Sequence, residues 1–167
     1  IIVINSGYAF VEADDPVFYP GDFDRELTEG CIPFIENKYR ILPGRDNRAI
    51  AGLSLGSTQA FSIGMRHREL FSWIGVFSGG LPITRPEYDY TDFFADPAAI
   101  DGALHLLFVS CGEQDPMYGP TMESVNRIQQ SGCQSILGTH YPGYHVWDVW
   151  RYSARDFLQE VFQERRL

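Results

Sequence analysis

The motif G-x-S-x-G at positions 52–56, centred on Ser54, constrains the fold of this chain more than any other segment. It overlaps the apolar run Arg48–Leu53, which has the length of a strand, and precedes a segment of helical spacing that begins near Ser57. Glycines on both sides of the serine suit a tight strand-to-helix turn, because they let backbone segments approach where a Cβ would collide. The following helix N-terminus directs N–H groups and partial positive charge toward the turn. The pattern therefore predicts a nucleophilic serine.

Strand-like and helix-like segments alternate along the rest of the chain. Apolar runs of strand length, each followed by Gly, Ser, Asn or Pro, are found at Ile1–Ile4, Arg48–Leu53, Trp73–Phe77, Leu104–Val109 and Ser135–Thr139. Helical spacing of apolar residues is found in Phe23–Tyr39, Ser57–His67, Met117–Gln130 and Val149–Arg165. Such alternation is typical of βαβ crossovers, so we expect one α/β domain over residues 1–167, with a mainly parallel sheet and helices on both faces.

One long segment, Gly79–Gly102, breaks this alternation. It is rich in proline, tyrosine and phenylalanine but has no clear periodicity. Long irregular connections in compact domains are usually functional loops or lids. The alternative is an excursion that covers an edge of the sheet with its aromatic side chains, and the sequence leaves both open.

A serine nucleophile requires a general base and an orienting acid, here expected in the order Ser, Asp/Glu, His. Of the four histidines, His67 lies at a helix end, His105 lies in an apolar run and His140 ends the last predicted strand. His145 lies in the loop beyond that strand, close to Gly143, where an imidazole can reach over the strand ends. We therefore predict that His145 is the base.

Asp115 is the predicted acid. It follows the strand Leu104–Val109, at the carboxyl edge where α/β sheets form their sites. From there its carboxylate can accept a hydrogen bond from an imidazole and select the tautomer. Glu113 and Asp148 are the competing carboxylates. Asp115 can also cap the helix that begins at Met117, and the two roles are compatible.

Composition excludes several kinds of partner. The chain has 13 Lys and Arg against 22 Asp and Glu, a formal net charge of −9, and an acidic surface repels nucleic acid and anionic membranes. No apolar stretch reaches the roughly 18 residues that span a bilayer. Its three cysteines lack metal-ligand spacing, and nothing else in the sequence indicates a metal or a cofactor.

Five segments, spread over almost the whole chain, form a more specific pattern than the serine motif alone. They are Ile32–Glu36 with Tyr39 and Arg40, Arg48–Ser54, Phe77–Gly79, Gly112–Asp115 and His145–Trp147. In this combination the sequence resembles the putative esterase family of α/β-hydrolases, which includes feruloyl esterases, acetylxylan esterases and the catalytic domain of enterochelin esterase. The resemblance implies an α/β-hydrolase fold with Ser54 as nucleophile, Asp115 as acid and His145 as base. It also implies that the backbone N–H of Leu55 is one oxyanion-hole donor.

The sequence departs from the family pattern in two ways. Gly56 is followed by Ser57 where members usually have a second glycine, a small change that should leave the turn intact. More importantly, the family's first strands, and the His-Gly loop that provides the second oxyanion donor, lie upstream of the segment that matches Ile1–Ile4. Because that run begins at residue 1, we expect a domain truncated at its N-terminus. An additional segment or a shifted pairing would then fill the gap between Ile1–Ile4 and Arg48–Leu53 in the sheet.

The resemblance implies a serine carboxylic ester hydrolase, most similar to feruloyl esterases acting on plant cell-wall esters. The expected substrate is a small-molecule or polysaccharide-linked ester. Tyr19, Tyr118, Tyr144 and Trp147 lie near the predicted strand ends, where stacking suits a phenolic or sugar group, although aromatic residues also fill cores. Acetylxylan esters, siderophore esters and acyl transfer are alternatives of the same class. The alternative of another class is a non-catalytic carbohydrate- or protein-binding module. A cell-wall esterase would be secreted or periplasmic.

Overall fold

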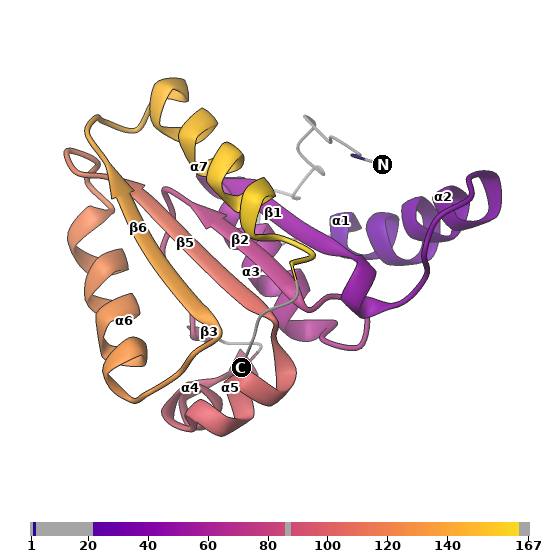
Figure 1. The fold of residues 1–167 in the computed structure, drawn as a ribbon, viewed down its shortest axis with the longest axis horizontal. Coiled ribbons are helices and arrows are strands. Elements are labelled where there is room, and N and C mark those ends of the chain that lie inside the picture. Colours follow the sequence, from indigo (N-terminus) through magenta and orange to yellow (C-terminus); the bar gives the residue numbers. More distant parts are fainter. Residues whose placement is uncertain (1, 3–21, 86–87, 164–167) are drawn as a thin grey trace.

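The computed structural model describes residue 2, residues 22–85 and residues 88–163, and its centre is one parallel sheet. The strand order is β1-β2-β5-β6, and every neighbouring pair is parallel. The strands are β1 (Ala49–Leu53), β2 (Trp73–Phe77), β5 (Leu106–Gly112) and β6 (Ile136–Tyr141) (Figure 1). The sequence predicted each of them, with β5 and β6 beginning and ending slightly later than expected. Of the fifth predicted strand, Ile1–Ile4, the structure describes only Ile2, which is 73% exposed and not part of a strand.

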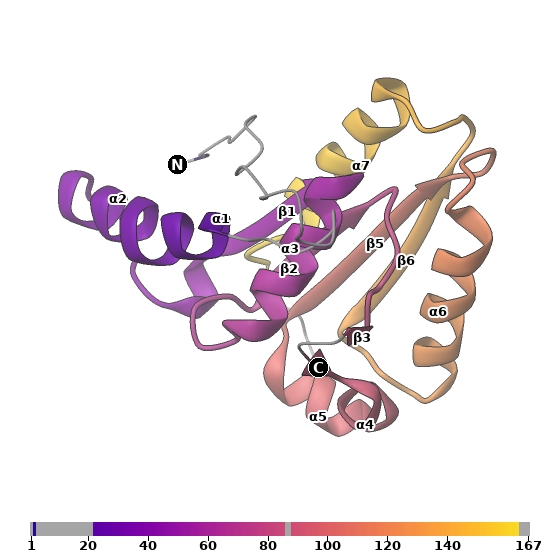
Figure 2. The same cartoon turned by 180° about the vertical axis from the view of Figure 1, so that it is seen from behind.

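Helices cover both faces of the sheet, as predicted. The helix α7 (Trp147–Glu160) crosses one face (Figure 1), and α3 (Leu55–Arg66) and α6 (Tyr118–Gln130) lie against the other (Figure 2). Strand residues alternate between the two layers because successive side chains point to opposite faces. In β2, for example, Ile74 packs on the α3 side and Trp73 on the α7 side. Among the described residues, no helix combines the length and apolarity that a membrane span requires.

The segment before β1 is helical but is not buried as its spacing indicated. It consists of α1 (Asp22–Arg25), the π-helical η1 (Glu26–Cys31) and α2 (Ile32–Lys38). The apolar positions of η1 and α2 are not buried, and Phe34 is 57% exposed. Polar contacts attach this segment to the domain instead. The buried Asp24 carboxylate accepts hydrogen bonds from Arg66 (2.6 Å) and bonds to His67 (2.8 Å), both at the end of α3.

A short 3₁₀ turn, η2 (Arg45–Asn47), leads into β1. In the part of the chain that the structure describes, β1 is an edge strand of the sheet. Within residues 22–85 and 88–163, β1 pairs with β2 alone. On its other side the sequence predicts either an additional segment or a shifted pairing with Ile1–Ile4. Ile2 is the one residue of that run that the structure describes, so this prediction stays untested.

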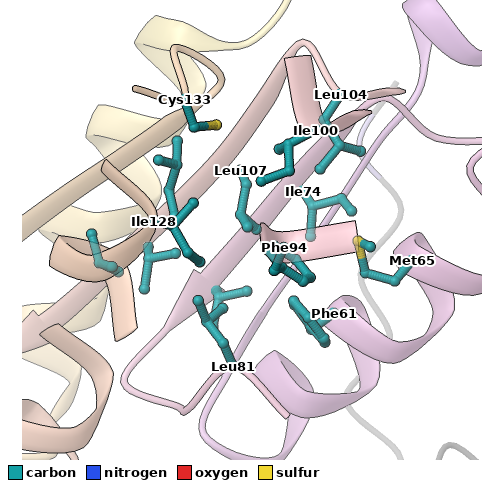
Figure 3. Close-up of a cluster of buried hydrophobic side chains, with 14 residues drawn as sticks. Phe61, Met65, Ile74, Leu81, Phe94, Ile100, Leu104, Leu107, Ile128 and Cys133 are labelled. Carbon is teal, nitrogen blue, oxygen red and sulfur yellow. The ribbon is translucent and has the colours of Figure 1, made fainter. Parts of the chain in front are cut away.

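The irregular segment after β2 covers the core and includes two helices that the sequence analysis missed. It contains the strand pair β3 (Thr84–Arg85) and β4 (Tyr88–Asp89), then α4 (Thr91–Ala95) and α5 (Pro97–Ala103). The Asp96 side chain caps α5 by accepting the N–H of Ala98 (2.9 Å). Phe94 stacks on Phe61 of α3 with ring centroids 5.9 Å apart, inside the larger hydrophobic cluster (Figure 3). Of the two interpretations left open, the packing favours the covering excursion, but the segment covers the core on the α3 face rather than an edge of the sheet.

This packing predicts that Phe94→Ala destabilises the fold. Removing a buried phenylalanine should lower the free energy of unfolding by about 3–5 kcal/mol, measured by urea denaturation. Phe34→Ala is the matched control, because its ring is mostly exposed, and should change stability by no more than about 0.5 kcal/mol. Equal effects of the two substitutions would show that the segment does not help to close the core.

Candidate active site

Ser54 lies between β1 and α3 in a strained backbone conformation. Its φ is 53° and its ψ is −121°, which for a residue with a Cβ costs about 1–3 kcal/mol. Hydrogen bonds hold the turn on both sides: the Ser54 N–H donates to the Phe77 carbonyl (2.9 Å), and the Ser54 carbonyl accepts the Ser57 N–H (3.0 Å). This is the strand-turn-helix context that the motif predicted.

The two glycines of the motif contribute differently. A Cβ on Gly52 would lie 2.0 Å from the carbonyl oxygen of Gly56, so the chain can turn this tightly only without a side chain there. A Cβ on Gly56 would meet nothing within 4 Å. The expectation that both glycines are needed for close approach is therefore wrong for Gly56, which supplies only the backbone that Gly52 contacts.

Two hydrogen bonds between Gln114 and Gly143 hold the loops after β5 and β6 together. The Gln114 N–H donates to the Gly143 carbonyl (3.0 Å), and the Gly143 N–H donates to the Gln114 side-chain oxygen (2.6 Å). A Cβ on Gly112 would lie 2.4 Å from the same Gly143 carbonyl, so the close approach depends on glycine at position 112. These contacts place Asp115 and His145 next to each other.

Ser54, His145 and Asp115 form a continuous hydrogen-bonded chain. The His145 Nδ1 lies 2.7 Å from Asp115 Oδ2, and its Nε2 lies 2.9 Å from Ser54 Oγ. A carboxylate only accepts, so Nδ1 carries the proton and donates to Asp115, while Nε2 accepts from the serine hydroxyl. The Asp115 side chain is fully buried, whereas that of His145 is 36% exposed. The arrangement can remove a proton from Ser54 and keep the resulting positive charge beside a buried negative one.

Asp115 is held as a carboxylate by its neighbours. Burial raises the pKa of this carboxyl, but hydrogen bonds from the Met117 N–H and from His145, together with the nearby polar hydroxyl of Ser78, outweigh burial and lower the pKa below its usual value. The Met117 N–H lies 2.9 Å from Asp115 Oδ1, directly before α6. The bond to the helix start and the bond to His145 therefore coexist, as the sequence allowed.

The competing groups bond elsewhere. Glu113 contacts His140 Nδ1 (2.9 Å), and Asp148 pairs with Arg151 (3.2 Å) on the exposed side of α7. The other two histidines also have carboxylate partners: His67 bonds to Asp24 and Glu69, and His105 to Asp46. His105 lies just before β5 and is half-exposed rather than inside the strand. Of the carboxylates and imidazoles compared, only Asp115 and His145 connect to Ser54.

Two of the four predicted substrate-binding aromatics flank His145 along the chain. Tyr144 is 66% exposed, and Trp147 is 71% exposed and contacts Trp150. Tyr118 is the first residue of α6, and its ring is perpendicular to that of His140, with ring centroids 5.8 Å apart. It therefore packs with the Glu113–His140 pair rather than with His145. Tyr19 lies outside the described residues.

The sequence analysis missed Trp150, which packs against the imidazole. Its ring lies edge-on to His145, with centroids 4.9 Å apart, and also contacts Trp147 (5.4 Å). The spacing of Trp147 and Trp150 places both on one side of α7, a signal that could have been read from the sequence. Trp150 joins the hydrophobic cluster beneath α7 and so connects the histidine loop to the core.

The described residues of this site indicate neither a thiol nucleophile nor a metal centre. Burial, followed by the negative charge of Asp115, raises the pKa of Cys111 to about 12, so this thiol stays protonated. Within the described ranges, no group of three or more His, Cys, Asp or Glu side chains is placed to hold a metal ion.

The model of the putative esterase family matches residues 18–159. The chain belongs to this family. The predicted family and the predicted α/β-hydrolase fold are thereby confirmed, because solved esterase structures share the same architecture.

Three relatives illustrate the similarity. An endo-1,4-beta-xylanase/feruloyl esterase of Xylanibacter ruminicola is 27% identical over 146 residues, which cover 87% of this chain and 18% of that protein. A ferulic acid esterase of the anaerobic fungus Anaeromyces mucronatus has a TM-score of 0.65 and 25% identity, over 86% of this chain and 54% of that one. The enterobactin esterase of Shigella flexneri has a TM-score of 0.62 at 19% identity, over 86% of this chain and 38% of that one, and shows the fold alone.

The unequal roles of the two glycines give a first prediction for this turn. Gly52→Ala should lower the free energy of unfolding by about 1–3 kcal/mol or more, because its Cβ would overlap backbone that cannot move aside. Gly56→Ala should leave stability unchanged or raise it by up to about 1 kcal/mol, since alanine favours a helix. Urea denaturation of both variants tests this, and equal losses would contradict the geometry.

The lowered pKa of Asp115 predicts acid-dependent stability. The stabilisation that ionised Asp115 gives the folded state is fully present above the pKa of aspartate in the unfolded chain, about 3.9. It is lost as the pH falls through the lower pKa of Asp115 in the folded state. The difference in unfolding free energy between the parent protein and Asp115→Asn should therefore shrink as the pH falls below about 4. Asp148→Asn, at an aspartate whose side chain is 80% exposed, is the control. A difference for Asp115→Asn that stays constant with pH would refute the prediction.

Proposed function

We propose that this chain provides the catalytic site of a serine carboxylic ester hydrolase, with Ser54 as nucleophile, His145 as general base and Asp115 as orienting acid. The observation that carries the proposal is the hydrogen-bonded chain from Ser54 through His145 to Asp115. Ser54 Oγ lies 2.9 Å from His145 Nε2, and His145 Nδ1 lies 2.7 Å from Asp115 Oδ2. Membership of the putative esterase family supports the same chemistry. The strained turn at Ser54 is also typical of a functional site.

In the first half of the reaction, the Ser54 oxygen bonds to the ester carbonyl carbon while His145 Nε2 takes the serine proton. Asp115 stabilises the imidazolium and does not itself accept the proton. The tetrahedral intermediate then collapses, the bond from carbon to the alcohol oxygen breaks, and His145 donates its proton to the leaving alcohol. Water repeats the sequence on the acyl-serine, which releases the acid and restores Ser54.

We assign stabilisation of the oxyanion to the start of α3. Leu55 is the first residue of the helix, where N–H groups have no acceptor within the helix. A helix N-terminus also carries partial positive charge that favours a developing alkoxide. Leu55 is therefore our candidate for one oxyanion donor.

Feruloyl esters linked to plant cell-wall polysaccharide are the proposed substrates. The X. ruminicola relative is named a feruloyl esterase as well as a xylanase, and the A. mucronatus structure is a ferulic acid esterase. The exposed rings of Tyr144 and Trp147 next to His145 suit stacking on a phenolic acyl group. An acetyl ester would offer no ring for these side chains to stack on.

The nucleophile assignment predicts the result of Ser54→Ala. In the full-length protein, hydrolysis of methyl ferulate should fall below about a thousandth of the parent rate, because triad nucleophiles contribute several orders of magnitude. Ser124→Ala, at a partly exposed helical serine, is the control and should retain full activity. Substantial turnover by Ser54→Ala would require a different nucleophile.

The substrate assignment predicts a selective effect of Trp147→Ala. Loss of stacking should raise KM for methyl ferulate by up to about tenfold and leave KM for methyl acetate unchanged. Tyr152→Ala removes another exposed aromatic of α7, which stacks on Tyr141 rather than near His145, and should alter neither KM. An equal effect of Trp147→Ala on both esters would argue against recognition of the phenolic ring.

A further inference from the structure

Ser78 has two features that are unfavourable for stability and that glycine would avoid. It follows β2 directly and has a φ of 51°, a conformation that residues with a Cβ rarely adopt. Its side chain is buried, with 1% of the residue exposed, and its Oγ lacks a hydrogen-bond partner of regular geometry. Strain and an unpaired buried hydroxyl at one position are better explained by a function than by folding.

The surroundings hold Ser78 in this conformation. Its N–H donates to the Ser110 carbonyl (2.7 Å), which joins the end of β2 to β5. The next residue, Gly79, fits so closely against the serine turn that a Cβ there would lie 1.7 Å from Ser57 Oγ. The Gly79 carbonyl also accepts the hydroxyl of Thr121 in α6 (3.2 Å). Ser78 is thus fixed between the nucleophile turn and the helix that follows Asp115.

The Asp115 carboxylate has room for a further donor. Its Oδ1 accepts a hydrogen bond from the Met117 N–H, and its Oδ2 accepts one from His145 Nδ1. A carboxylate can accept about four hydrogen bonds. The Ser78 hydroxyl lowers the pKa of this carboxyl and also that of the Cys111 thiol, so it faces both groups. Hydrogen bonds of catalytic groups are often long or poorly aligned in the free enzyme and tighten as the reaction proceeds.

We propose that Ser78 is a positioning residue for the reaction: its buried hydroxyl donates to Asp115 as His145 becomes protonated and holds the carboxylate in the plane that His145 needs. The proposal rests on the proposed function, because it assigns Ser78 to the same triad. Ser78 acts through Asp115 and makes no contact with substrate.

The test compares Ser78→Ala and Ser78→Gly with Ser110→Ala in the full-length protein. Ser110 is the matched control, because its hydroxyl is equally buried, equally unpartnered and lies on the neighbouring strand. We expect Ser78→Ala and Ser78→Gly to lower kcat for methyl ferulate about tenfold or more, with KM unchanged. The thermal midpoint should not fall in either variant and should rise in Ser78→Gly, where the strain is relieved. Ser110→Ala should retain the parent kcat.

A spectroscopic measurement separates positioning from packing. In Ser78→Ala, the downfield proton resonance of the His145 Nδ1–H should move, and in Ser110→Ala it should not. An unchanged kcat in both Ser78 variants would overturn the proposal, as would a loss of kcat that follows a lower thermal midpoint. Ser54→Ala, measured in the same assay, identifies the other failure: if the parent turnover does not depend on Ser54, the proposed function falls together with this inference.

Discussion

Parallel pairing of the four strands is the constraint on which the site depends. Because β1, β5 and β6 run in one direction, their carboxyl ends lie along the same edge of the sheet. Ser54 directly follows β1, Asp115 follows β5 and His145 follows β6. Residues that are 91 positions apart in sequence thereby come within 2.9 Å. In each loop, a glycine or a backbone hydrogen bond is then enough to place the side chain of Ser54, Asp115 or His145.

Strain is concentrated at this edge, and the rest of the domain compensates for it. Ser54 and Ser78 are two of the three non-glycine residues with positive φ in the described chain, and they directly follow neighbouring strands. The hydrophobic clusters on the two faces bury the central strands β2 and β5 completely. Burial of this kind stabilises a domain enough to hold a few unfavourable conformations in a site. The covering segment around Phe94 contributes to that stability.

The sequence indicated the site better than it indicated the covering layers. Buried parallel strands appear as apolar runs, so the strand ends and Ser54 could be located from local patterns. The helices α4 and α5 escaped detection because they are too short for periodicity to register, although Asp96 before Pro97 is a readable helix start. The exposure of Phe34 and the contact of Trp150 with His145 depend on tertiary packing, which helical spacing alone does not determine.

Labelling with a fluorophosphonate tests the central claim most directly, because the reagent reacts only with a serine that its neighbours activate. Mass spectrometry of the labelled full-length protein should find the adduct on Ser54, with a labelling rate that falls by about four orders of magnitude in Asp115→Asn. Glu113→Gln, whose carboxylate contacts His140 instead, should label at the parent rate. An adduct on another residue, or equal slowing by the two substitutions, would contradict the account.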